Sequence, residues 1–278
     1  MKNILITGAN SYIGMAVEKY LGNYPERYRV DTLDMIGINL DEQDFSRYDT
    51  VFHVAGIAHR KETKENADLY YAINEKLAVE TAEKAKKDGV KQFIILSSMS
   101  VYGMNVGHIT KETIPNPVNS YGKSKYNADL KLEFMDSANF KISILRPPMV
   151  YGKNCKGNYQ VLRKFALSSP IFSGFRNERS MIYIKNLAEF VKRVIDEEKS
   201  GLFFPQDSEY VCTADMVKKI AECNRKKIIV THMFNWAVEL GLLLKIEVFS
   251  KVFGSLTYEK TDLVTEYDFS KAIECTEE

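Results

Sequence analysis

The sequence has almost no net charge and few cysteines, and both features exclude classes of protein. Its 38 Lys and Arg residues balance 37 Asp and Glu residues to a formal net charge of +1, so no global field recruits nucleic acid. The cysteines are Cys155, Cys212, Cys223 and Cys275. They show no CxxC spacing and no nearby His, so we expect no metal site, no disulfide framework and a cytoplasmic location.

Long uncharged hydrophobic runs and targeting segments are also missing. The N-terminus carries one lysine and then a strand, unlike a signal or transit peptide. The most apolar stretch, residues 234–253, contains Glu239, Lys245, Glu247 and Lys251, which are too many charges for a spanning helix. We interpret it as an amphipathic helix, in the substrate-domain core or at a subunit contact rather than on a membrane surface.

Short apolar runs alternate with helical patterns over the first two thirds of the chain. Strands are predicted at residues 3–7, 29–34, 50–54, 92–97 and 141–146. Helices are predicted at residues 13–21, 67–87 and 121–135. This alternation predicts an α/β fold, a Rossmann-type doubly wound parallel sheet with helices on both faces.

The first strand runs into the motif "TGANSYIG", which begins at Thr7. Gly8 suits a tight turn with positive φ, and Gly14 permits close packing of the next helix on the strand. Ser11 takes the place of the middle glycine of the dinucleotide fingerprint. The start of a helix offers free N–H groups to a pyrophosphate, although a plain strand-to-helix turn has a similar pattern.

An acidic residue strengthens the interpretation as a dinucleotide site. Asp34 ends the second predicted strand twenty positions after Gly14, where a carboxylate can bind ribose hydroxyls. The next residues, Met35, Ile36 and Gly37, include no Arg or Lys for a 2′-phosphate. The sequence therefore favours NAD over NADP.

Tyr121 and Lys125 are four residues apart on a predicted helix and so share a face. Lowering the pKa of a tyrosine from about 10 toward 7 takes roughly 4 kcal/mol, and one cation at about 4 Å supplies an energy of that order at an effective dielectric near 20. We therefore expect Lys125 and an oxidised nicotinamide ring to lower the pKa of Tyr121 together. Ser97 and Ser98 lie at the end of a predicted strand, at the sheet edge where open α/β folds bind ligands. An incidental YxxxK at a helix start is the alternative.

Six motifs together resemble the extended short-chain dehydrogenase/reductases, the NAD(P)-dependent epimerases, dehydratases and reductases of nucleotide sugars. In chain order, from residue 1 to about 190, they are "TGANSYIG", "VFHVAG", "LSSMSVYG", "YGKSK", "LRPPMVYG" and "RSMIYI". Within that group the chain most resembles bacterial surface-polysaccharide enzymes that act at C4 of UDP-linked N-acetylated sugars.

The resemblance implies a role for each matching residue. The catalytic residues would be Ser98, Tyr121 and Lys125. The NAD-binding residues would be Gly8, Asn10, Ser11, Tyr12, Ile13, Gly14, Asp34, Asn39, Leu40, Val54, Ala55, Gly56, Tyr121, Lys125 and Pro148. The substrate-binding residues would be Ser98, Asn158 and Arg179. Arg179 would bind the sugar diphosphate, although its neighbour is Ser180 where the family usually has Asp.

The resemblance also implies a domain division and an assembly. Residues 1–170 would form the NAD-binding domain, with residues 179–204 returning to it, and residues 171–278 the smaller substrate-binding portion. The protein would be a homodimer, formed through a four-helix contact, that takes a UDP-sugar.

The first expected activity is NAD(P)H-dependent reduction of the C4 ketone of a UDP-linked 6-deoxy-N-acetylhexosamine, for surface-polysaccharide precursors. The alternative is a UDP-hexose 4-epimerase, acting on a UDP-glucose or UDP-N-acetylglucosamine type of sugar, with tightly held NAD. A 4,6-dehydratase is disfavoured, because Met99 and Ser100 follow Ser98 where such enzymes carry an Asp-Glu pair. A non-catalytic dinucleotide sensor is the alternative of another class.

Several other residues attract attention but have simpler explanations. His53 alternates within a predicted strand and is expected in the core, and His59 is expected to make structural hydrogen bonds. Tyr102 and Tyr151 are expected to pack around the cofactor cleft without chemistry. Cys155 has no identifiable activating partner and is not expected to be a nucleophile.

Overall fold

The computed structural model describes residues 1–58, 62–63, 66–260 and 264–278. These residues form two compact units. The first unit comprises residues 1–103, 115–147 and 187–205. The second unit comprises residues 104–114, 148–186 and 206–278. The assignment of NAD binding to one part of the chain and substrate binding to another stays a prediction.

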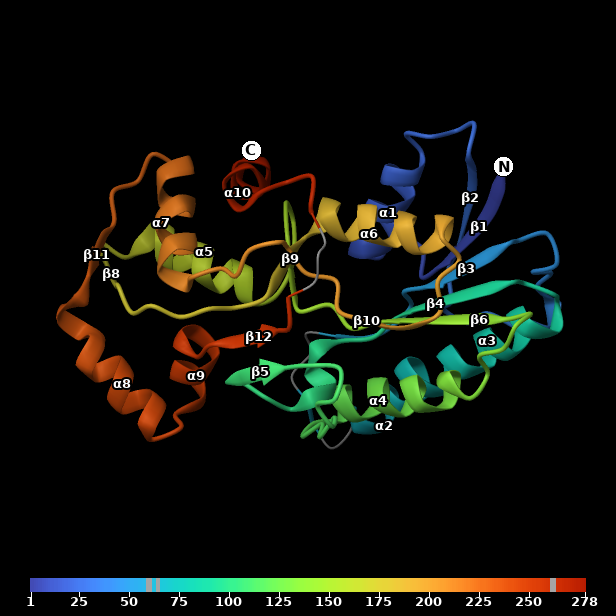
Figure 1. The fold of residues 1–278 in the computed structure, drawn as a ribbon, viewed down its shortest axis with the longest axis horizontal. Coiled ribbons are helices and arrows are strands. Elements are labelled where there is room, and N and C mark those ends of the chain that lie inside the picture. The colour runs from blue at the N-terminus through green and yellow to red at the C-terminus, as the bar shows by residue number, and fades with distance from the viewer. Residues whose placement is uncertain (59–61, 64–65, 261–263) are drawn as a thin grey trace. The chain divides into compact units, whose positions relative to one another are not determined.

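The first unit is built on a six-stranded parallel sheet (Figure 1). In spatial order its strands are β10 (Gly201–Phe203), β6 (Lys141–Leu145), β4 (Gln92–Leu96), β3 (Thr50–His53), β1 (Lys2–Thr7) and β2 (Tyr28–Leu33). Every neighbouring pair is parallel. Five of these strands confirm the predicted ones, with ends that differ by a single residue, and the Rossmann-type fold class is confirmed.

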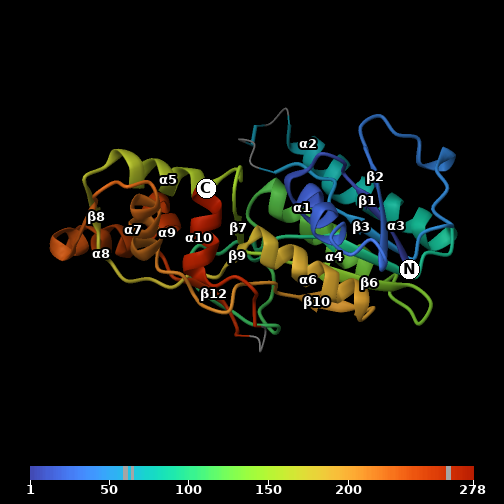
Figure 2. The ribbon, with the colours of Figure 1, turned by 90° about the horizontal axis from the view of Figure 1, so that it is seen from above.

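Helices cover both faces of this sheet. Figure 1 shows α1 (Tyr12–Leu21) and α6 (Ile184–Asp196) on one face, which is the face toward the viewer in Figure 2. The other face carries α2 (Ala67–Tyr70), the π-helix η2 (Tyr71–Lys76), α3 (Leu77–Lys87) and α4 (Ser120–Glu133). Ala78 and Ala82 of α3 pack in one core cluster with Val51 and Phe93 of the sheet. Small residues on α3 allow the helix to lie close to the strands.

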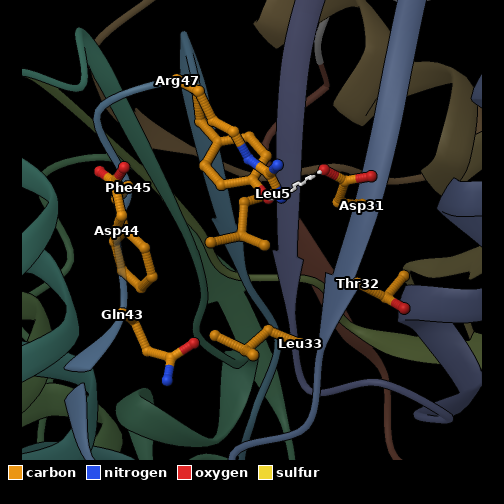
Figure 3. Close-up of a pocket in the computed structure, with 9 residues that line it drawn as sticks. Leu5, Asp31, Thr32, Leu33, Gln43, Asp44, Phe45 and Arg47 are labelled. Carbon is orange, nitrogen blue, oxygen red and sulfur yellow. Dashed lines mark hydrogen bonds and ion pairs between the residues drawn. The ribbon is translucent and has the colours of Figure 1, made fainter.

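The connection between β2 and β3 departs from the usual doubly wound pattern. Residues 34–49 contain only the short 3-10 turn η1 (Leu40–Glu42) instead of a helix. Phe45 and Tyr48 of this connection are buried and supply the apolar surface that a helix would bring. A cavity of about 460 Å³ lies beside them, and Arg47 bridges to Asp31 across 3.0 Å (Figure 3).

The second unit contains short parallel strand pairs and helices. The pairs are β5 (Gly107–Ile109) with β12 (Leu256–Tyr258), β7 (Met149–Tyr151) with β9 (Met181–Tyr183), and β8 (Ile171–Ser173) with β11 (Ile229–Thr231). The helices are α5 (Asn158–Ser168), α7 (Thr213–Cys223), α8 (Asn235–Leu243), α9 (Glu247–Phe253) and α10 (Phe269–Glu277). Helix α7 packs between α5 and α10.

The apolar segment 234–253 contains all of α8 and α9. Of the two positions expected for it, the core does not hold for Trp236, Leu240, Leu243 and Leu244, which are exposed, and a subunit contact stays a prediction. Periodicity identified the helix but does not tell which side of it is covered. Among the described residues, no helix is both long enough and apolar enough to cross a membrane.

Candidate active site

The turn after β1 has the geometry of a backbone cradle. Gly8 has φ +102°, and a Cβ atom there would stand 2.7 Å from the backbone nitrogen of Ala55. Asn10 also has positive φ, at 63°. Ser11 caps α1 and accepts a hydrogen bond from the Gly14 backbone N–H at 3.2 Å. Ser11 therefore serves the helix start, in place of the fingerprint's middle glycine.

Other residues expected to bind NAD lie in the segments that come after strands β2 and β3. Asp34 comes directly after β2 with an exposed carboxylate, and its Oδ1 accepts a hydrogen bond from the Ile36 N–H at 3.0 Å. Val54 and Ala55 follow β3 and are buried. Asn39 caps η1, which contains Leu40.

Lys125 lies at the centre of the site. It is only 5% exposed, and its Nζ donates a hydrogen bond to the backbone oxygen of Leu96, at the end of β4, at 2.8 Å. A Cβ atom on Gly56 would lie 3.3 Å from this nitrogen, so the loop after β3 passes directly beside the ammonium. Burial lowers the pKa of Lys125 to about 8, and the Asp129 carboxylate opposes this shift.

Tyr121 is one turn before Lys125 on α4 and is half-buried. The Ser98 side chain lies beside the phenol and is the hydrogen-bonding group that acts on its pKa. The centroids of the Tyr121 and Tyr70 rings are 6.2 Å apart in an edge-on contact. Burial raises the pKa of Tyr121, and the Ser98 hydrogen bond opposes this rise. The expected lowering of this pKa by Lys125 together with an oxidised nicotinamide ring stays a prediction.

Two local features bring Ser98 and Tyr121 together. Ser98 caps the short 3-10 helix η3 (Met99–Tyr102) directly after β4. Asn119 caps α4 by accepting a hydrogen bond from the Gly122 N–H at 2.8 Å. A Cβ atom on Gly122 would stand 2.7 Å from the Ser100 backbone oxygen. The bare glycine thus lets the start of α4 lie against η3.

Behind Lys125 lies a buried polar cluster that the sequence analysis missed. Asp129 accepts hydrogen bonds at Oδ2 from Ser97 at 2.7 Å and from Arg146 at 2.9 Å. Arg146 also donates to the Tyr102 hydroxyl at 2.8 Å. Burial raises the pKa of Asp129, and Arg146 opposes this. In the sequence, the only indication of this cluster was a carboxylate, Asp129, four residues after Lys125.

Asn74 is a second missed residue. It lies on η2 and is fully buried. Its Oδ1 accepts a hydrogen bond from the Ile57 N–H at 2.9 Å, and its Nδ2 donates to the Ser124 hydroxyl at 3.3 Å. Asn74 therefore joins the loop after β3 to α4. Its only signal was a polar residue inside an apolar helical stripe.

The remaining expected residues belong to the second unit. Pro148 begins a segment of that unit, and Asn158 is the exposed first residue of α5. Arg179 is half-buried and donates a hydrogen bond to the Gly254 backbone oxygen at 2.7 Å. Ser180, beside it, donates to Gln206 at 2.7 Å. The structure thus brings Ser98, Tyr121 and Lys125 together in the first unit, and the substrate roles of Asn158 and Arg179 stay predictions.

The residues given simpler explanations behave as such where they are described. His53 is fully buried and pairs with Thr7 at 2.8 Å, and burial lowers its pKa to about 3. Tyr151 is buried and donates to Asp207 at 2.9 Å. Cys155 is buried, which raises the pKa of its thiol. His59 lies outside the described residues.

Comparison with known proteins places this geometry in a family. The model of the "NAD dependent epimerase/dehydratase family" matches residues 4–203. A UDP-glucose 4-epimerase of Vibrio cholerae is 29% identical over 95% of this chain and 84% of its own length. An N-acetyl-alpha-D-glucosaminyl-diphospho-ditrans,octacis-undecaprenol 4-epimerase of Escherichia coli O157:H7 is 26% identical over 97% of this chain and 88% of its own.

A solved structure shares the fold over nearly the whole chain. The UDP-glucuronic acid 4-epimerase of Bacillus cereus, in complex with NAD, superimposes with a TM-score of 0.75 at 19% identity, over 99% of this chain and 95% of its own. The chain therefore belongs to the NAD dependent epimerase/dehydratase family and is an enzyme that uses NAD.

Proposed function

We propose that this enzyme is a 4-epimerase of a UDP-linked hexose or N-acetylhexosamine. The observation that carries the proposal is that Ser98 and Tyr121 lie beside each other, one helical turn from the buried ammonium of Lys125. The two relatives described above, which match nearly the whole chain, are both named 4-epimerases. Their names support chemistry at C4 without identifying the sugar.

The residues of the first unit fit a bound dinucleotide. Gly8 leaves room where a Cβ atom would contact Ala55, and the start of α1 beyond it suits a pyrophosphate. Asp34 offers an exposed carboxylate after β2 for the ribose hydroxyls. These residues would hold NAD, whose nicotinamide would supply a reversible hydride acceptor for the chemistry at the sugar carbon.

The chain's own residues handle the proton and the oxygen of the sugar. Tyr121 would take the proton of the 4-hydroxyl group and later return it, acting as general base and then general acid. Ser98 would hold the same oxygen through its hydroxyl. Lys125 would favour the phenolate of Tyr121, because its ammonium sits one turn away and below pH 8 is mostly charged.

The C4 ketoreductase is the second candidate, because the same three residues could deliver a proton to a ketone. The two activities differ in what happens to the cofactor. An epimerase returns the hydride and consumes no NADH, whereas a reductase consumes one NADH for each sugar reduced.

The test is to incubate the purified protein separately with UDP-glucose, UDP-N-acetylglucosamine, an undecaprenyl-diphosphate N-acetylglucosamine and a UDP-4-keto-6-deoxy-N-acetylhexosamine. We expect one 4-hydroxy sugar to convert to its C4 epimer, seen by NMR, with no net change in NADH absorbance. Stoichiometric NADH loss with the keto sugar alone would overturn the epimerase in favour of the reductase. If only the lipid-linked sugar is converted, the proposed carrier of the sugar would be undecaprenyl diphosphate instead of UDP.

A further inference from the structure

Helix α8 carries a stripe of large apolar side chains on its solvent side. Trp236 is 67% exposed and Leu243 is 78% exposed. Leu240, between these two residues in sequence, and Leu244, directly after Leu243, lie on the same helical face and are also exposed. Met233, in the turn before the helix, is exposed as well. The spacing of these residues, three or four apart, is that of one helical stripe. Isolated exposed apolar residues are ordinary, but a continuous stripe indicates a contact surface.

The outward direction of this stripe is fixed by contacts on the opposite side of α8. Val238 and Gly241 are its buried residues. A Cβ atom on Gly241 would lie 2.5 Å from the Phe249 ring, so α9 packs directly against that side. Asn235 accepts a hydrogen bond from the Ser173 hydroxyl at 3.0 Å at the start of the helix. Val238 and Gly241 therefore face the protein, and Leu240 and Leu243 face outward.

Basic residues flank the stripe. Lys245 is exposed directly after Leu244. Arg225, Lys226 and Lys227 are exposed just before β11, the strand that leads into the α8 segment. Residues 225–251 hold five Lys and Arg against two Glu, and one of these carboxylates, Glu247, is paired with Lys251 at 2.5 Å. The segment is thus more basic than the chain, whose net charge is +1.

We propose that α8 and the turn into α9 dock on an anionic lipid surface. Trp236, Leu240 and Leu243 would enter the boundary between headgroups and acyl chains, and Lys245 would lie among the phosphates. A leucine stripe with a tryptophan and flanking cations is the pattern of helices that lie in a membrane interface. A two-fold contact with a second copy would instead bring two basic flanks together. The proposal rests on α8 and its neighbours alone and is independent of the catalytic activity.

The chain offers a built-in probe, because Trp236 is its single tryptophan. The full-length protein is mixed with vesicles of phosphatidylglycerol and phosphatidylcholine, or of phosphatidylcholine alone. We expect flotation with the anionic vesicles, a blue shift of the tryptophan emission and quenching by lipids brominated on their acyl chains. Binding should weaken with added salt, because the cations contribute to it.

A double variant, Leu243→Glu with Leu244→Glu, should lower the vesicle-bound fraction at least tenfold. The matched control is Phe134→Glu with Val161→Glu, which adds the same charge at two exposed apolar positions elsewhere and should bind as the wild type does. Circular dichroism checks that both variants are folded.

Two results would overturn the proposal. One is wild-type protein that remains unbound with an unshifted tryptophan emission. The other is a dimer, seen by sedimentation velocity without lipid, that the Leu243→Glu, Leu244→Glu variant dissociates. The second result would assign the stripe to a second copy. The brominated-lipid measurement uses wild-type protein, so it decides the question even if a variant fails to fold.

Discussion

Gly122 and Ser100 are in such close contact that a Cβ atom on Gly122 would stand 2.7 Å from the Ser100 backbone oxygen. This contact joins the helix that carries Tyr121 and Lys125 to the turn that begins at Ser98. The approach of Tyr121 to Ser98 therefore depends on the absence of a side chain at Gly122. The position of the reacting groups is set by backbone packing.

Replacing Gly122 with alanine should separate α4 from η3. We expect kcat to fall at least about tenfold, because small displacements of reacting groups are costly, and the free energy of unfolding to fall by about 1–3 kcal/mol from overpacking. Lys123→Ala, at the next and exposed position, is the control. A Gly122→Ala enzyme with full activity would show that this contact does not position Tyr121.

Gly8→Ala should weaken NAD binding more than tenfold. The substitution combines a positive φ of 102° with a Cβ atom 2.7 Å from the Ala55 nitrogen, so the turn must shift. Gly89→Ala is a matched control, because Gly89 has φ +84° and open space around its Cβ position. Isothermal titration with NAD measures both. Equal losses of affinity in the two variants would mean that strain, not the cradle, is responsible.

Tyr121→Phe should lower kcat at least about a hundredfold, which is the usual contribution of a general acid–base group. NAD affinity and thermal stability should change little, since the ring keeps its contact with Tyr70. Tyr126→Phe, on the same helix, is the control and should remain active. Retained turnover in the Tyr121 variant would remove it from the proposed proton transfer.

The depressed pKa of Lys125 predicts a pH dependence of stability. Its pKa is about 8 when folded and about 10.4 when unfolded. Between these values the unfolded chain binds the extra proton, so stability rises with pH from 8 to about 10.4 and the penalty is fully present below 8.

This slope should disappear when the amine is removed. From pH 8 to 9.5, the wild type should gain up to about 2 kcal/mol of unfolding free energy over Lys125→Met, at about 1.4 kcal/mol for each pH unit. Urea titrations of cofactor-stripped protein measure it, with Lys123→Met as the exposed control. Parallel pH profiles of wild type and Lys125→Met would contradict the burial of this charge.

Asp129→Asn should destabilise the fold by about 3–5 kcal/mol, because Arg146 stays buried after losing its carboxylate. The substitution should also lower the pKa of Lys125 further, since Asp129 is the group that opposes its depression. Asp68→Asn, on the surface of α2, is the control, and Asp129→Glu should restore part of the stability. A loss below about 1 kcal/mol would show that the cluster accommodates a neutral group.

Some features could be predicted because they depend on neighbours in the sequence. The strands at residues 3–7 and 92–97 follow from apolar runs, and the shared face of Tyr121 and Lys125 follows from their spacing of four on a helix. The turn at Gly8 follows from a glycine at the end of a strand. These determine the fold class and the residues of the candidate site.

Other features needed residues that are distant in the chain. The hydrogen bond between Arg146 and Asp129 forms only when strands and helices have packed. The same holds for the hydrogen bonds of Asn74 with Ile57 and Ser124. The pKa of Lys125 is set by the burial that this packing creates.

The sequence by itself determined the alternation of strands and helices, the glycine turn and the shared face of Tyr121 and Lys125, because local periodicity and backbone preferences depend on consecutive residues. The choice of Ser98 as their partner came from the resemblance to a family. Only the tertiary structure decided that residues 34–49 replace a helix with Phe45 and Tyr48, and that α8 turns its leucines outward. Both depend on which surface a neighbouring element covers. That information is absent from any short stretch of sequence.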